Sequence, residues 1–193
     1  VKVLPPGHGA VVENVVSQSN GGIGIQGAEA MVVSDCSAAG NVAWGFELGK
    51  GSNIHGCSAL NNRGGGIFVD GGSLVRGNTA YRNGRQRTDD ANRGCGAATL
   101  AGIAAVGEGS RVDGNTVCHN TIGLQLHSGG NSVSENMVTD NDTNYQFEPG
   151  NMLELMLCEL PQTISWPAKV TLARTLTGIA GEHGITVDAD GVA

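Results

Sequence analysis

The sequence is poor in aromatic residues and in proline, and this scarcity limits the fold classes that the chain can adopt. Aromatic residues make up 4% of the chain, and only 5 of its 193 residues are proline. Such a composition argues against a helical bundle. No window contains the roughly 18 consecutive apolar residues of a membrane-spanning helix. Residues 1–9 also lack the charged and then apolar pattern of a signal peptide.

Blocks of like charge are missing as well. The net charge of -7 comes from 18 acidic and 11 basic residues that are scattered along the chain, so nucleic acid and an anionic membrane surface are not expected as partners. The cysteines have no CxxC spacing, which argues against a zinc site or a redox motif. We therefore expect buried thiols rather than a disulfide framework at the five positions Cys36, Cys57, Cys95, Cys118 and Cys158.

Glycine and a repeat are what the sequence has instead. There are 32 glycines. Aliphatic residues recur every 21 residues, and one longer interval of 37 implies an insertion of 16 residues: Val12, Val33, Ile54, Val75, Val112 and Val133. Eight residues after each of them stands an asparagine: Asn20, Asn41, Asn62, Asn83, Asn120 and Asn141. A fixed period of this length is the signature of a solenoid.

Further columns accompany these two. Small or polar residues follow each aliphatic residue, as in Cys36 with Ala38 and Cys57 with Ala59, and we expect them to line an inward face. A second strand is expected after each asparagine, around Ile25, Phe46, Ile67, Ile103 and Leu124. Equivalent side chains should then stack about 4.8 Å apart, so that the asparagines pass hydrogen bonds from turn to turn. Glycines in GG and NG pairs are expected to supply positive φ angles at the bends.

The repeats SNIHGCSALNNRGGGIFVDGG, SLVRGNTAYRNG and SRVDGNTVCHNTIGLQLHSGG resemble the right-handed parallel β-helix proteins of the pectate-lyase-like superfamily, bacterial members included. The resemblance implies an all-β, right-handed parallel β-helix of about six turns with one lateral insertion. The resemblance covers roughly residues 8–150, and the β-helix domain is expected to span residues 1–150. That superfamily includes polysaccharide lyases, glycoside hydrolases, epimerases, tailspikes and adhesins, so the resemblance selects no single activity.

Residues 151–193 break the period and resemble the segment that usually opens such a protein. His183 to Val187 parallel His8 to Val12, so the segment looks like the start of another turn. Because an open solenoid end exposes unpaired strand edges, we expect residues 160–193 to cover the N-terminal end, either in cis or on a second copy in a homo-oligomer. A tail left at the end of a longer tandem array is the alternative.

Candidate catalytic residues lie beside the insertion. The position before the asparagine column carries Asn61, Arg82, His119 and Asp140 on successive turns. The insertion itself, residues 84–101, brings Asp89 and Asp90. Long loops on rigid scaffolds often carry function. No metal site or cofactor is expected, although these carboxylates near Arg82 leave room for Ca²⁺ as in pectate lyases.

Two other outward stripes are visible. One contains Glu13, Ser34, His55, Arg76, Asp113 and Ser134, in which we expect Arg76 and Asp113 to form a surface ion pair. The other offers Glu47, Phe68 and Gln125 as ligand-binding candidates, since an exposed phenylalanine among polar groups can stack on a sugar ring.

The outward positions are mostly small and polar, which favours a non-catalytic β-helix that is structural or glycan-binding. A polysaccharide lyase or glycoside hydrolase acting beside residues 84–101 is one alternative. An end-to-end assembly module is the other. A polysaccharide is the expected partner, and an extracellular or cell-surface location is slightly favoured.

Overall fold

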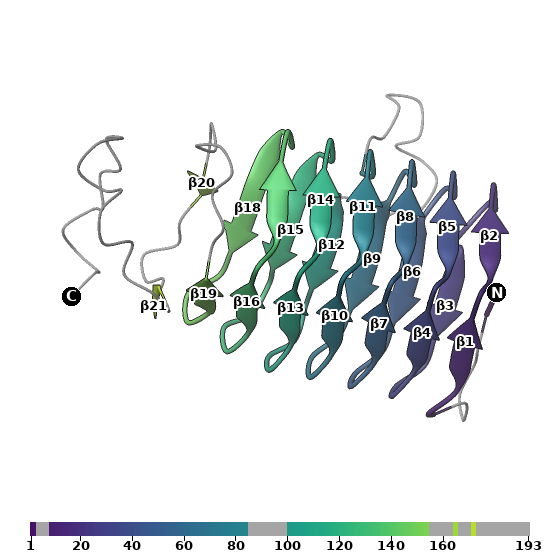
Figure 1. Ribbon diagram of the computed structural model, residues 1–193, viewed down its shortest axis with the longest axis horizontal. Helices are drawn as coiled ribbons and strands as arrows, with labels where there is room; N and C mark the ends of the chain where they lie inside the picture. The colour runs from purple at the N-terminus through teal and green to yellow at the C-terminus, as the bar shows by residue number, and fades with distance from the viewer. Residues whose placement is uncertain (3–7, 85–99, 155–163, 166–170, 173–193) are drawn as a thin grey trace.

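The computed structural model is a parallel β-solenoid whose turns stack along one axis (Figure 1). The structure describes residues 1–2, 8–84, 100–154, 164–165 and 171–172. Each full turn contributes one strand to each of three parallel sheets, and the described residues contain no helix. Accordingly, no membrane-crossing helix is found in this part of the chain.

The three sheets run side by side along the solenoid. Sheet 1 consists of β1 (Val11–Glu13), β4 (Val32–Ser34), β7 (Asn53–His55), β10 (Leu74–Arg76), β13 (Arg111–Asp113), β16 (Ser132–Ser134), β19 (Met152–Glu154) and β21 (Thr171–Leu172). Sheet 2 consists of β2 (Val16–Gln18), β5 (Ser37–Ala39), β8 (Ser58–Leu60), β11 (Thr79–Tyr81), β14 (Thr116–Cys118) and β17 (Met137–Thr139). Sheet 3 consists of β3 (Ile25–Gly27), β6 (Trp44–Leu48), β9 (Gly65–Val69), β12 (Ala101–Ala105), β15 (Ile122–Leu126), β18 (Thr143–Phe147) and β20 (Ile164–Ser165).

The core is built from the columns that the repeat predicts. In sheet 1 the aliphatic column pairs in register from Val12 to Val133, and every member is buried. Leu153 continues this column by one further turn. The column that begins at Ile25 and Phe46 is buried in sheet 3, and Ala38, Ala59 and Ala80 are buried in sheet 2. The predicted register and the 21-residue period are therefore confirmed.

Each turn has three strands, not the two that the sequence analysis distinguishes. The predicted first strand is divided into one strand of sheet 1 and one of sheet 2. The first of the two residues between these strands has a positive φ in six successive turns, with φ between 51° and 64°: Asn14, Asp35, Gly56, Gly77, Gly114 and Glu135. Because such a backbone conformation interrupts an extended strand, the chain bends here.

The asparagine column forms a continuous hydrogen-bonded ladder. Asn20 donates through its side-chain amide to Asn41 at 2.8 Å, Asn41 to Asn62 at 2.8 Å, and Asn62 to Asn83 at 3.0 Å. The ladder continues through Asn120 and Asn141, whose amide ends on Asn144 at 3.0 Å. The predicted turn-to-turn bonding is confirmed.

Two further ladders line the other corners. In one, backbone N–H groups donate to the side chains of Cys36 and Cys57, then to those of Asn78, Asn115 and Asn136. The other, which the sequence analysis missed, runs through Ser52, Ser73, Ser110, Asn131 and Asn151. The thiols of Cys36, Cys57 and Cys118 are free, whereas Cys95 and Cys158 lie outside the described residues.

Glycine has two different roles, one at the bends and one beside the asparagine ladder. Gly72, Gly84 and Gly130 have positive φ angles, as expected for glycine pairs. The glycines that precede the sheet 3 core column, such as Gly24 and Gly45, do not. At Gly45 a Cβ atom would lie 2.7 Å from Asn62 Nδ2, so the side chain is absent because the ladder occupies its space.

The two ends of the solenoid involve segments outside the repeat. At the N-terminal end, Lys2 forms a parallel bridge with Gln26 of β3. At the C-terminal end, β20 pairs with β18 and β21 pairs with β19. These four residues of the 160–193 segment therefore extend the C-terminal end, not the N-terminal one. Ile185 and Val187, on which the expectation of N-terminal capping depends, lie outside the described residues.

Candidate functional site

The corner between sheets 2 and 3 brings together the predicted Arg82, His119 and Asp140. They occupy the same position on successive turns, and their φ angles are 55°, 60° and 55°. Asn61, one turn earlier, has a φ of 54°. This left-handed conformation is enriched for Asn, Asp and His but is disfavoured for Arg. It turns these side chains outward at the end of sheet 2.

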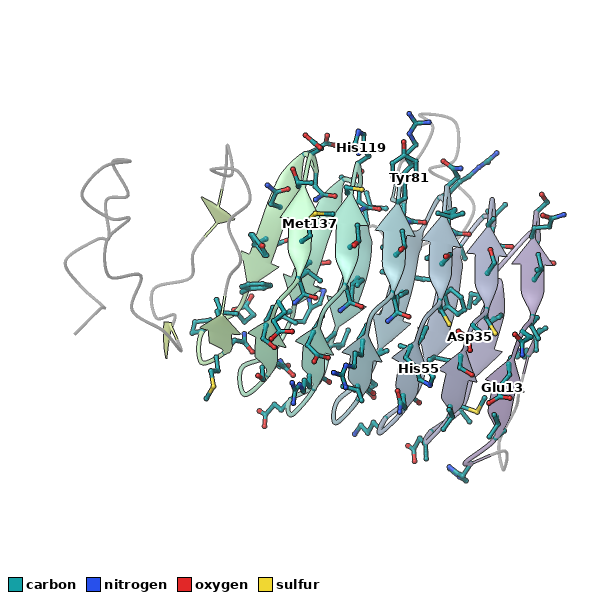
Figure 2. All side chains as sticks on the ribbon, in the orientation of Figure 1. Glu13, Asp35, His55, Tyr81, His119 and Met137 are labelled. Atoms are coloured by element: carbon teal, nitrogen blue, oxygen red, sulfur yellow. The ribbon has the colours of Figure 1, made fainter. Side chains whose placement is uncertain are left out.

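Aromatic contacts tie this corner to the adjacent strands. The Tyr81 and His119 rings lie 5.2 Å apart between centroids, and the Arg82 guanidinium carbon lies 5.0 Å from the centre of the Tyr81 ring. Figure 2 shows Tyr81 and His119 at the same end of the neighbouring strands β11 and β14. A cation over an aromatic face contributes about 0.5–1 kcal/mol at an exposed site. Tyr81 therefore orients Arg82, a relation that the residue pattern did not indicate.

Cys118 also lies at this corner, where Asp140 affects its thiol. Burial raises the pKa of the Cys118 thiol, and the negative charge of Asp140 raises that pKa further. The thiol is thus held protonated, which does not suit a nucleophile. Asp89 and Asp90 lie outside the described residues, so the structure does not place them relative to Asp140.

The outward face of sheet 3 carries a pair of aromatic side chains. Trp44 on β6 and Phe68 on β9 meet edge to face, with their ring centroids 5.4 Å apart. Gly65 makes this arrangement possible, because a Cβ atom there would lie 2.3 Å from the Trp44 ring. The repeat pattern pointed to Phe68 but not to Trp44. The available signal was the glycine that stands in register with Trp44 on the next turn.

Polar side chains flank these rings on the same face. Gln26 donates to Glu47 at 2.9 Å, and Gln125 donates to Gln146 at the same distance. Glu47 is in register with Phe68, and Ala104 separates Phe68 from Gln125. Gln125 is buried, and its side-chain oxygen has no hydrogen-bond partner. The predicted ligand-binding residues Glu47 and Phe68 are thus neighbours, whereas Gln125 lies two turns from Phe68.

The third stripe differs from the expected surface ion pair. Arg76 and Asp113 do lie together, with Arg76 Nε 3.7 Å from Asp113 Oδ2. However, the Asp113 side chain is only 4% exposed, and Arg111 Nη2 also contacts the same oxygen at 3.1 Å. This is a buried carboxylate between two exposed arginines, not a pair of exposed charges.

Within the described ranges, no group of three or more His, Cys, Asp or Glu side chains is arranged to hold a metal ion.

Comparison with known proteins yields a family match. A family model described as the right-handed beta helix region matches residues 4–117, which is more than half of the chain. No curated protein and no solved structure matches the chain.

Proposed function

Because the chain belongs to the right-handed beta helix family, we propose that it is a non-catalytic β-helix that binds a polysaccharide on the outward face of sheet 3. One observation carries this proposal, namely the Trp44 and Phe68 pair on that face. Aromatic rings present a negative face that attracts the C–H groups of a sugar ring. Outward rings on a rigid scaffold are therefore suited to stacking on a glycan.

The surroundings of the two rings support the same ligand class. Glu47 lies beside Phe68 and supplies carboxylate oxygens that accept hydrogen bonds from sugar hydroxyls. Equivalent positions repeat about every 4.8 Å along the sheet, which gives a long, straight face. A linear polymer matches such a face better than a compact small molecule does, since solenoids recognise ligands over extended surfaces.

Affinity gel electrophoresis tests the proposal. Native gels are cast with neutral or acidic polysaccharides, with and without calcium, and the migration of the protein is compared with that in a plain gel. We expect at least one polysaccharide to retard the wild type, and we expect W44A and F68A to abolish this effect. Tyr81→Ala removes an aromatic side chain from sheet 2 and serves as the matched control. Failure of every polysaccharide to retard the wild type would contradict the proposal, as would normal retardation of both variants.

A polysaccharide-degrading enzyme is the rival function, favoured by the contact of Arg82 and His119 with Tyr81 at the corner. Incubation of the same polysaccharides with the protein separates the two functions. Release of unsaturated or reducing-end products by the wild type, and its loss in H119A and D140N, would establish catalysis in place of binding alone.

A further inference from the structure

Two arginines on the outward face of sheet 1 share one buried carboxylate. Arg76 on β10 and Arg111 on β13 both approach Asp113 Oδ2, at 3.7 Å and 3.1 Å. We propose that Arg76 and Arg111, called here the arginine pair, bind the anionic groups of an acidic polysaccharide, either carboxylate or sulfate. This face is separate from the Trp44 and Phe68 face, so the inference does not depend on the proposed function.

The charge balance of the cluster leaves it cationic. One arginine is enough to neutralise Asp113, and the second leaves a net charge of one positive unit. Asp113 is 4% exposed on its side chain, so its own charge is withdrawn from solvent, while Arg76 and Arg111 are 66% and 61% exposed. A ligand approaching this face therefore meets guanidinium groups before it meets the carboxylate.

Most donors of the arginine pair are available to a ligand. Each guanidinium carries five N–H groups in a planar fork, which suits bidentate contact with carboxylate or sulfate. The contact from Arg111 Nη2 is a hydrogen bond, whereas the Arg76 contact exceeds hydrogen-bond length. Asp113 thus holds the two side chains near each other while it accepts one hydrogen bond, from Arg111 Nη2. Its second oxygen, Oδ1, is buried and has no hydrogen-bond partner among the described residues.

On the adjacent strands the residues in register with the cluster carry no negative charge, and Glu135 follows Ser134 at the bend after β16. On β7 the residues in register with Leu74 and Arg76 are Asn53 and His55. On β16 the residues in register with Arg111 and Asp113 are Ser132 and Ser134. Figure 2 shows Glu13 farther along sheet 1, and Ser34 stands between it and His55 in register. A local cationic site therefore lies on a chain whose net charge is -7.

That overall charge also favours a polysaccharide over nucleic acid. Nucleic acid carries a dense row of phosphates and is bound through extended basic surfaces. A single pair of arginines on an acidic protein fits an isolated carboxylate or sulfate on a sugar chain better.

The experiment compares three soluble polymers by isothermal titration calorimetry with the full chain. Polygalacturonate supplies carboxylates, dextran sulfate supplies sulfates, and dextran is neutral. The test variant is R76Q/R111Q. Its matched control is K2Q/K50Q, which removes two exposed positive charges elsewhere. Circular dichroism verifies that both variants are folded.

We expect the wild type to bind at least one acidic polymer, more weakly at high salt, and R76Q/R111Q to lose at least about tenfold in affinity because two charge-assisted contacts are removed. K2Q/K50Q should stay within about twofold, as expected for distant screened charges. The acidic polymer that binds identifies the group as carboxylate or sulfate.

Equal losses in R76Q/R111Q and K2Q/K50Q would overturn the inference, as would binding of dextran alone or no binding of either acidic polymer. The variants W44A and F68A distinguish this inference from the proposed function. If they abolish binding of the acidic polymer and R76Q/R111Q does not, the anion binds on sheet 3 and the arginine pair has no such role.

Discussion

Asn41 and Asn62, which lie 21 residues apart, are joined by two hydrogen bonds to the same oxygen. Asn62 Oδ1 accepts from the Asn41 backbone N–H at 3.0 Å and from the Asn41 side-chain amide at 2.8 Å. The Asn62 amide donates in turn to Asn83 Oδ1 at 3.0 Å and to the Ala38 carbonyl at 2.9 Å. The buried side chain thus uses its full hydrogen-bonding capacity, which explains why asparagine recurs there.

Replacing Asn62 with alanine should therefore destabilise the fold strongly. The change leaves the Asn41 donors and the Ala38 carbonyl without this partner, and each buried polar group left unpaired costs about 1–3 kcal/mol. We expect N62A to lower the free energy of unfolding by at least about 2 kcal/mol in urea titrations followed by circular dichroism. The control is N20A, at the exposed end of the same ladder, which should cost less. Equal losses in the two variants would show that the ladder does not stabilise the core.

The ladder also predicts the effect of alanine at two glycines. At Gly66 a Cβ atom would lie 2.3 Å from the Gly102 carbonyl oxygen and 3.0 Å from Asn83 Nδ2, whereas at Gly21 no atom lies within 4 Å. We expect G66A to lower the free energy of unfolding by about 1–3 kcal/mol, as for overpacked sites. G21A should change stability by less than about 1 kcal/mol. Thermal unfolding measures both, and a well-tolerated G66A would contradict the packing seen at this corner.

The repeat predicts the inward columns because a solenoid places equal positions of successive turns directly above one another. Two other features are not predicted by the repeat. The ladder through Ser52 and Ser110 changes to asparagine at Asn131, and its last interval to Asn151 is 20 residues, so neither residue type nor period reveals it. The burial of Asp113 depends on side chains of adjacent strands, which strand alternation does not encode.

The candidate site was predictable in part for the same reason. Register brought Arg82, His119 and Asp140 together, because all three occupy one column. The contact of Trp44 with Phe68 is different, since it joins two columns diagonally and depends on the missing side chain of Gly65. For sheet 1, the repeat predicted that Arg76 and Asp113 lie side by side. It did not predict that the Asp113 side chain is buried, because this depends on how the neighbouring side chains pack.

The bend between sheets 1 and 2 offers a stabilising substitution. Glu135 has a φ of 55° at a position that carries asparagine, aspartate or glycine on the other turns. The left-handed conformation costs an ordinary residue about 1–2 kcal/mol, and asparagine tolerates it better. E135N should therefore raise the free energy of unfolding by up to about 1 kcal/mol. E13N, in strand β1, should bring no such gain, and urea titration of both variants provides the comparison. A loss of stability in E135N would show that the glutamate side chain makes a compensating interaction.

The stability of the protein should fall on mild acidification through His127. Burial lowers the pKa of His127 below its ordinary value of 6.5, and the nearby Glu148 opposes this effect only in part. Its Nε2 atom is buried without a hydrogen-bond partner, so the folded state favours the neutral ring. The unfolded chain binds the proton more readily, and the resulting stabilisation is present above the unfolded pKa and is lost as the pH falls toward the folded pKa. Between about pH 7.5 and about pH 5, the wild type should thus lose more stability than H127Q.

H8Q removes an exposed imidazole and controls for the loss of a histidine as such. Urea midpoints across this range give the comparison, and NMR titration of the His127 ring should give a midpoint below 6.5. Identical pH profiles for the wild type and H127Q would mean that the ring is protonated as easily in the folded protein as in the unfolded chain.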